Sequence, residues 1–343
     1  MNKTLLAGLT LTIGIAGCQS NSTPEKVQAE QTNSVSQPVY EIEHHYAQQF
    51  LGQTAMLESA LQQFCAETTD KKAVKQQWHQ TMQAWMKLQG QERGPEAALE
   101  QSWNIQFWPD KKNTTGRKMA ALTNSDKQWT QQQIATQSVT VQGLGALEWL
   151  LYDSKSPLKR GEESCSTATA IAGNLHNNAK IIASAWSENP WKALSDKEWT
   201  SEYLSLLSNQ LEYSMKKLSR PLAKIGQPRP YFAESWRSES SYANLKSNLQ
   251  GMQALYFADG KGLDARLRSI DKAELADRIA NQFSTALETW PEEQSLFASL
   301  KGKEGYRNAL AQYNKLEYLK HLIHEEVAIE LGVVIGFNAT DGD

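Results

Sequence analysis

The chain has 343 residues, of which 40% are hydrophobic and 21% charged, and this composition excludes both a disordered and a fibrous protein. Its 35 lysines and arginines face 38 aspartates and glutamates, so a net charge of −3 without a long basic run argues against nucleic acid as a partner. Eleven tryptophans occur with only ten prolines, a combination that favours long helices around an aromatic core.

The N-terminus has the features of a removable export signal. One positive charge at Lys3 is followed by an apolar stretch, residues 5–17, that is too short to span a bilayer. The run Ile15-Ala16-Gly17-Cys18 resembles a bacterial lipobox, in which Cys18 becomes the lipidated first residue of the mature protein. A plain secretory signal is the alternative.

The residues after Cys18 predict where the body of the protein lies. Gln19 rather than Asp follows the lipidation site, which favours the outer membrane, with the body of the protein in the periplasm. Residues 18–39 have the composition of a flexible tether. The first expected partner is therefore the outer membrane, reached through the lipid anchor.

Two further cysteines, Cys65 and Cys165, are expected to form a disulfide bond, because an exported protein meets an oxidising compartment and neither cysteine has zinc-site spacing. The bond would close a loop of about 100 residues, which the chain-entropy model values at about 4–5 kcal/mol. Two separate buried thiols are the alternative.

Helical periodicity dominates the remaining chain and predicts an all-α fold. The expected helices span residues 41–66, 72–88, 144–152, 165–187, 197–219, 242–256, 272–289 and 304–330, and another begins at Ser125-Asp126. Two strand-like runs, Ser138–Val141 and Val333–Phe337, are too few and too far apart for a sheet.

The proline-containing segment 220–240 is the expected boundary between two helical-bundle domains, residues 40–220 and 221–343. Two aromatic pairs, Trp78 with Trp85 and Trp103 with Phe107, are expected to belong to the core.

Four segments together resemble the imelysin family, and the match covers about residues 40–343. They are Trp108-Pro109-Asp110, Gly143-Leu144-Gly145-Ala146-Leu147-Glu148, Glu234-Ser235-Trp236-Arg237-Ser238, and the C-terminus from Leu331-Gly332-Val333 to Asp341-Gly342-Asp343. The resemblance implies two helical bundles with a cleft between them, an exported or lipid-anchored protein, and a link to iron. Some members of the family are classed as metallopeptidases.

One residue departs from the family signature Gly-x-His-x-x-Glu, because Gly145 stands where the histidine belongs. An imidazole and a carboxylate three residues apart share one helical face and can hold the same metal ion. Glu148 alone is a poor zinc ligand and would at most help to hold a harder ion such as Fe³⁺ or Ca²⁺, together with oxygen ligands from elsewhere in the chain. Of the functions that the resemblance implies, the metallopeptidase is the one that the missing histidine weakens most.

Three groups of residues are candidates for ligand binding. Glu148 lies in an apolar helix with Gly143 and Gly145, so it either faces a ligand or is satisfied by a structural partner. Two further groups are a cleft-facing set (Glu234, Ser235, Arg237 and Ser238) and a charged set that could attract an anion (Arg93, Asp110, Lys111, Lys112 and Arg117). Helix capping and ordinary solvation are the respective alternatives.

A further candidate for a metal or haem site consists of His321, His324 and Glu325, which share one face of the last long helix. A solvated surface is the alternative, and the His44-His45 pair is weaker still.

The leading functional hypothesis is an accessory binding lipoprotein for iron-related uptake, which meets an iron-uptake receptor or a small iron-containing ligand. An imelysin-type metallopeptidase that uses Glu148 and a haem-binding protein are the alternatives. The cofactor is left open, with iron or another metal favoured over haem.

Overall fold

The computed structural model describes residues 34–125, 127–159 and 163–333. These residues form helices and the turns that connect them, with no strand beyond an isolated bridge between Lys224 and Gln227. The all-α prediction is confirmed. The longer helices are α1 (Gln37–Cys65), α2 (Lys71–Leu88), α5 (Thr114–Thr123), α7 (Gly143–Tyr152), α8 (Glu163–Ala185), α9 (Asp196–Leu222), α10 (Ser241–Phe257), α12 (Ala273–Glu288) and α14 (Lys303–Lys320).

Short helical segments connect these elements. They are α3 (Glu96–Leu99), α4 (Ser102–Ile105), α6 (Gln131–Ala135), α11 (Leu263–Ser269), α13 (Leu296–Ser299) and α15 (Ala328–Glu330), the 3₁₀ turns η1 (Val139–Val141), η2 (Pro230–Phe232) and η3 (Ala258–Gly260), and the π-helical segment η4 (His321–Val327). Because η4 joins α14 to α15 without a break, the expected helix over 304–330 is present as one continuous element.

Side-chain caps set the beginning of several helices. Asp70 accepts a hydrogen bond from the main-chain N–H of Ala73 at the start of α2. Reciprocal capping boxes, Thr130 with Gln133 and Ser195 with Glu198, begin α6 and α9. Each cap satisfies main-chain donors that have no partner inside the helix.

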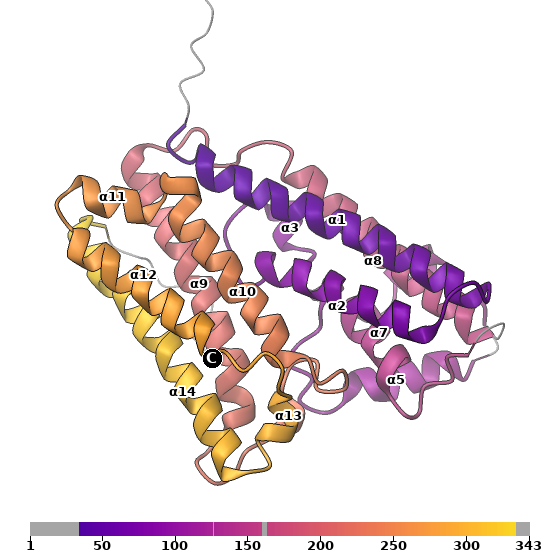
Figure 1. Cartoon of the computed structure of the whole chain (residues 1–343). Coiled ribbons are helices and arrows are strands. Elements are labelled where there is room, and N and C mark those ends of the chain that lie inside the picture. The colour runs from indigo at the N-terminus through magenta and orange to yellow at the C-terminus, as the bar shows by residue number, and fades with distance from the viewer. Residues whose placement is uncertain (1–33, 126, 160–162, 334–343) are drawn as a thin grey trace, which may run out of the picture. The chain divides into compact units, whose positions relative to one another are not determined.

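The helices pack as layers around α2. α1 packs along α8 and α2, and α10 packs on both α2 and α9, so α10 runs between these two helices (Figure 1). α9 also packs along α14, which in turn contacts α12. The described residues from Ser34 onward form one compact unit, and the division into two bundles at residue 220 stays a prediction.

The prediction of an aromatic core is confirmed for the α2 pair, Trp78 and Trp85, and is wrong for Trp103 on α4. The side chains of Trp78 and Trp85 are buried, as expected for residues on the packed face of α2. Trp103 is 53% exposed, although its ring lies 5.7 Å from that of Phe107. α4 is only four residues long and lies at the surface. One side of it therefore has no neighbouring helix to bury Trp103.

The expected disulfide bond between Cys65 and Cys165 is confirmed, with 5.7 Å between the two Cα atoms. It joins the last residue of α1 to the beginning of α8, two helices that pack along each other. The alternative of two separate thiols is therefore excluded.

Two predicted helix boundaries were wrong, at Ser125 and before Pro221. The helix expected from Ser125 begins instead at Gln131, because Thr130 supplies the cap, and α5 precedes it unpredicted. The strand-like run at Ser138 forms the 3₁₀ turn η1. α9 continues through Pro221, which lies in the last turn, where the missing N–H of proline removes a single hydrogen bond.

The C-terminal residues 334–343, most of the second strand-like run among them, lie outside the described residues. The same is true of the export signal and of Cys18. Val333 is buried.

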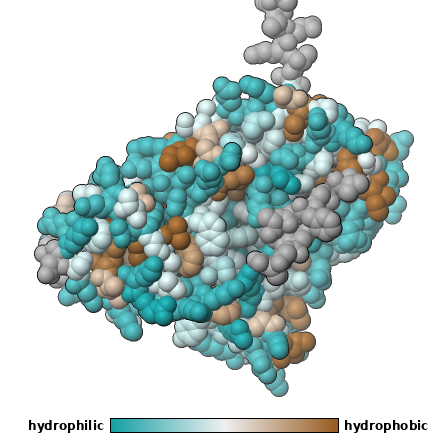
Figure 2. Space-filling view, turned by 180° about the vertical axis from the view of Figure 1, so that it is seen from behind, coloured by the Kyte–Doolittle hydropathy of each residue, from teal (hydrophilic) through white to brown (hydrophobic). Residues whose placement is uncertain are grey.

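Hydrophilic side chains cover most of the face shown in Figure 2, and the hydrophobic side chains there form small, separated groups. Within the described part of the chain, no helix combines the length and apolar character that a membrane span requires.

Candidate functional site

Glu148 on α7 is buried, and its Oε1 accepts two hydrogen bonds from Ser238, in the segment that precedes α10. The main-chain N–H of Ser238 lies 2.8 Å away and its hydroxyl 2.9 Å away. Burial raises the pKa of Glu148, and the Ser238 hydrogen bonds and the Arg237 guanidinium partly offset this rise. The two candidate groups that carried the family resemblance therefore meet here.

Gly143 lets α7 start close enough to α4 to place Glu148. Its φ is +64°, and a Cβ there would lie 2.2 Å from the carbonyl oxygen of Ile105 and 2.4 Å from that of Asn104. The indole N–H of Trp78 also donates to the carbonyl of Leu144 at 3.1 Å. Only glycine fits at position 143 without displacing the main chain.

Gly145 is different, because a Cβ at this position would meet no atom within 4 Å. The space beside it is part of a cavity that Glu148 also lines. The glycine therefore leaves open the volume that a side chain would occupy next to the carboxylate, and helix packing does not require it.

Arg237 ties the same segment to two other elements. Its Nε donates to Oδ2 of Asp153, directly after α7, at 2.8 Å, and its Nη2 donates to Oδ1 of Asn113 at 2.7 Å. The guanidinium also lies 4.3 Å from the centroid of the Trp236 ring. The Asp153–Arg237 ion pair is largely buried, so Arg237 is held in one orientation.

Glu234 and Lys217 form a second, fully buried ion pair, with 2.7 Å between Oε2 and Nζ. Oε1 of Glu234 accepts hydrogen bonds from Gln106 at 3.2 Å, Ser235 at 3.0 Å and Asn244 at 3.0 Å. Burial lowers the pKa of Lys217, and the charge of Glu234 opposes this. All polar atoms of the pair thus have partners, as a buried pair requires.

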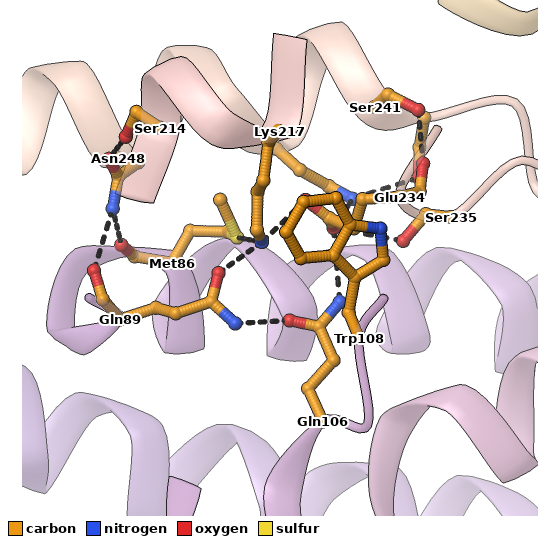
Figure 3. A network of polar contacts seen from close by, with 12 residues as sticks. Met86, Gln89, Gln106, Trp108, Ser214, Lys217, Glu234, Ser235, Ser241 and Asn248 are labelled. Carbon is orange, nitrogen blue, oxygen red and sulfur yellow. Dashed lines mark hydrogen bonds and ion pairs between the residues drawn. The ribbon is translucent and has the colours of Figure 1, made fainter. Parts of the chain in front are cut away.

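Figure 3 shows this network between α9 and the end of α2, with the ammonium group of Lys217 pointing away from α9 toward Gln89 and lying beside the Trp108 ring. The amide of Gln89 links Lys217 to Gln106. Lys217 therefore anchors the Glu234 segment to α2, and through it the neighbouring Ser238 that holds Glu148.

Three cavities follow one another along these contacts. We call the row of three cavities the seam. The first, of about 440 Å³, and the middle one, of about 40 Å³, share Gln106 and Trp108. The middle one and the third, of about 540 Å³, share Trp236 and Arg237. The middle cavity has room for a few water molecules or one small group, and Glu148 lies in it.

The seam collects most of the predicted candidates. Glu148, Gly145, Asp110, Ser235 and Arg237 line the middle cavity. Arg93 lines the first cavity and Arg117 the third.

The other candidates lie outside these cavities or serve structural roles. Lys111 lines a separate groove described below, and Lys112 is exposed. Both carboxylate oxygens of Asp110 accept hydrogen bonds from the first main-chain N–H groups of α5, at 2.6 and 2.9 Å.

The histidine cluster lies apart from the seam. The ring nitrogens of His321 lie 3.0 Å from the carboxylate of Glu325 and 3.6 Å from that of Glu326 on η4, and its side chain is 48% exposed. His324 and Glu325 share this surface segment, and Nδ1 of His44 donates to the carbonyl of Trp186 at 2.7 Å. None of these histidines lines the three cavities of the seam.

Sequence reasoning missed Lys217, Gln89 and Gln106. The available signal was Lys217 itself, a charged residue beside Met215 and Leu218 on the apolar face of α9. The two glutamines carry no such signal, because a polar residue near a helix end is ordinarily exposed.

The residues around Glu148 do not fit a catalytic zinc ion. Position 145 offers no imidazole, and Oε1 of Glu148 already accepts two hydrogen bonds from Ser238. Across residues 34–125, 127–159 and 163–333, no group of three His, Cys, Asp or Glu side chains could hold a metal ion, whereas a catalytic zinc takes three protein ligands.

The family model described as imelysin matches residues 42–323 of this sequence. The chain belongs to the imelysin family. It resembles the crystal structure of an imelysin-like protein from Psychrobacter arcticum 273-4, with a TM-score of 0.75 and 21% identity over 88% of this chain and 96% of that one. None of the curated proteins matches it.

A second solved structure with the same fold is described as an iron-regulated protein A precursor from Parabacteroides distasonis ATCC 8503. Its TM-score is 0.63, with 12% identity over 84% of this chain and 94% of that one. At these identities the two likenesses establish the imelysin-like fold, and the function has to be argued from the seam.

Proposed function

We propose that this imelysin is an accessory binding protein of the cell envelope, anchored to the outer membrane through Cys18, that takes part in iron-related uptake by binding a small ligand along the seam. The observation that carries the proposal is the buried carboxylate of Glu148, fixed by Ser238 and facing the space left open at Gly145.

The seam has the properties of a small-molecule site. The two larger cavities, of about 440 and 540 Å³, fall in the usual range for ligand pockets, and aromatic side chains such as Trp103, Trp108 and Trp236 line them. The polar groups beside them are held by the ion pairs of Lys217 and Arg237. A preorganised site loses less conformational entropy on binding than a flexible one.

Iron is the favoured cargo for two reasons. A protein of the same fold is described as iron-regulated. The middle cavity presents oxygen donors from Glu148, Asp110 and Ser235, and hard ions such as Fe³⁺ prefer oxygen ligands. Because Oε1 of Glu148 and both carboxylate oxygens of Asp110 already accept hydrogen bonds, these side chains hold a bare ion poorly, and we propose that iron arrives as a small oxygen-rich chelate.

The described residues do not supply the ligands that the two alternative functions, metallopeptidase and haem binding, would need. A metallopeptidase needs a ligand set that the residues around Glu148 do not supply. A haem site needs an axial ligand, and His321 contacts Glu325 and Glu326 at the surface, away from the seam.

The test is a titration of the full chain carrying Cys18→Ser with ferric citrate, followed by tryptophan fluorescence, since Trp78, Trp108 and Trp236 line the middle cavity. We expect a saturable change that iron-free citrate does not produce and that Glu148→Gln weakens about tenfold or more. Glu326→Gln is the matched control, because Glu326 pairs with Arg278 outside the seam.

A response that is absent, or that both variants weaken equally, would contradict binding at the seam. Peptide cleavage that a chelator abolishes and that Glu148→Gln removes would establish the metallopeptidase instead.

A further inference from the structure

A groove of about 520 Å³ lies where the chain reverses after α9, and its charged lining is wholly cationic. The four cations are Lys111, Arg220, Lys224 and Arg229, and the other lining residues are Ser219, Ala223, Gln227 and Phe232. The groove shares no lining residue with the three cavities of the seam.

Main-chain hydrogen bonds hold two of these cations in place. The N–H of Arg229 donates to the carbonyl of Pro221 at 2.8 Å, and the N–H of Gln227 donates to the carbonyl of Lys224 at 2.8 Å. Gly226, with a φ of +75°, allows the tight turn between them. The turn therefore fixes Lys224 and Arg229 against the end of α9.

Aromatic rings orient the two guanidinium groups. That of Arg220 lies 5.8 Å from the centroid of the Trp108 ring, and that of Arg229 lies 5.5 Å from the centroid of the Phe232 ring. Such contacts limit the freedom of arginine and leave its N–H groups available to a ligand.

None of the four cations has an ion-pair partner within 4.0 Å among the described residues. Asp110, the neighbour of Lys111 in sequence, already accepts two hydrogen bonds from the start of α5. The negative end of the α9 dipole favours Arg220 and Lys224, but it does not account for Lys111, which precedes α5.

Four positive charges that lie in one groove, with no ion-pair partner in the part of the chain that the structure describes, repel one another unless an anion neutralises them. We propose that this groove binds a multivalent phosphate-bearing anion, either a free polyphosphate or the phosphate groups of a lipid headgroup. Arginine and lysine side chains are the donors that proteins use for this chemistry.

The binding test uses inorganic tripolyphosphate and isothermal titration calorimetry on the full chain carrying Cys18→Ser. We expect one tripolyphosphate to bind per chain, with an affinity that falls as salt is added and that Lys224→Glu/Arg229→Glu weakens about tenfold or more. The matched control is Lys118→Glu/Arg307→Glu, which makes the same change in net charge at two exposed residues outside the groove.

A second arm distinguishes the two sources of the phosphate. Vesicles of phosphatidylglycerol and phosphatidylcholine are sedimented with each variant. The groove variant and the control variant have the same N-terminal residues, so any difference in their vesicle binding comes from the groove. Vesicle binding that the groove variant loses and that tripolyphosphate displaces assigns a lipid headgroup, whereas tripolyphosphate binding alone assigns a free anion.

Equal weakening by the groove and control variants, or no tripolyphosphate binding at low salt, would overturn the proposal. Circular dichroism monitors folding, and if the charge reversal unfolds the chain, Lys111→Gln/Lys224→Gln provides the same test at two exposed residues. Because the groove and the seam have no lining residue in common, failure here leaves the proposed function of the seam untouched.

Discussion

Oε1 of Glu148 accepts hydrogen bonds from both the main-chain N–H and the hydroxyl of Ser238, which lies 90 residues further along the chain. This contact fastens the segment before α10 to α7 and satisfies a carboxylate that is buried in an otherwise apolar helix. Without it the buried carboxyl group would lose much of its stabilisation.

We expect Ser238→Ala to lower the free energy of unfolding by about 1–2 kcal/mol, because one hydrogen bond to a buried carboxyl group is lost. Urea unfolding followed by circular dichroism measures the change. Ser269→Ala is the control, since Ser269 is exposed and its hydroxyl donates only within its own helix to the carbonyl of Arg266. Equal stability of the two variants would show that the Ser238 hydroxyl does not stabilise Glu148.

Gly143 and Gly145 should respond oppositely to substitution. Gly143→Ala is expected to cost about 2–4 kcal/mol, because the new Cβ strikes two carbonyl oxygens and φ is positive. Gly145→His should fold with nearly unchanged stability and should bind Zn²⁺ more tightly than the natural chain. Thermal unfolding and zinc calorimetry are the measurements.

The control for the zinc experiment is Gly145→His/Glu148→Gln, in which the gain should disappear. Stoichiometric zinc binding by the natural chain that Glu148→Gln abolishes would show that other ligands replace the missing histidine.

Glu43 should make the chain less stable as the pH rises. It is fully buried, Gln91 donates to its Oε1 at 2.6 Å, and burial raises its pKa from 4.5 to about 8. Between these two pH values the unfolded chain loses the proton and the folded chain keeps it, so the free energy of unfolding falls as pH increases. The total loss is a few kcal/mol, at about 1.4 kcal/mol per pH unit.

We expect Glu43→Gln to flatten this slope and to be more stable than the natural chain at pH 8, as measured by urea unfolding from pH 5 to 8. Glu41→Gln, two residues away and exposed on the same helix, should leave the slope unchanged. Parallel pH profiles for Glu43→Gln and the natural chain would contradict the assignment.

The buried pair of Lys217 and Glu234 should couple strongly. Lys217→Met alone is expected to cost about 3–5 kcal/mol, because it leaves the charge of Glu234 buried without a counter-charge. Adding Glu234→Gln should recover part of this loss. A double-mutant cycle measures the coupling, and the partly exposed pair of Lys246 and Glu292 is the control, with about 0–1 kcal/mol expected. Similar coupling in the two cycles would refute a special role for the buried pair.

Cys18→Ser should release the protein from the membrane fraction of the envelope, since no helix among the described residues could span a membrane in place of the lipid. Fractionation and immunoblotting give the readout. Gln19→Asp should keep the lipid and move the protein to the inner membrane. A Cys18→Ser variant that still sediments with the outer membrane would rule out the lipid anchor.

Much of the helical fold could be read from the spacing of apolar residues, because one buried stripe repeats every three to four positions and each residue reports on its own helix. The core positions Trp78 and Trp85 followed from this pattern. The pattern did not predict α5, because the start of this helix is capped by Asp110, four residues upstream, rather than by the residue next to the helix.

The sequence by itself determined the helical class and the two motifs that contain Glu148 and Ser238, since periodicity and local motifs are properties of neighbouring residues. It predicted the disulfide bond between Cys65 and Cys165, but only the structure brought the two cysteines within bonding distance. Only the tertiary structure decided what satisfies Glu148, why Gly143 and Gly145 differ, and that Lys217 is buried. Those answers depend on atoms from helices far apart in the chain, whose approach is set by packing and not by spacing along the sequence.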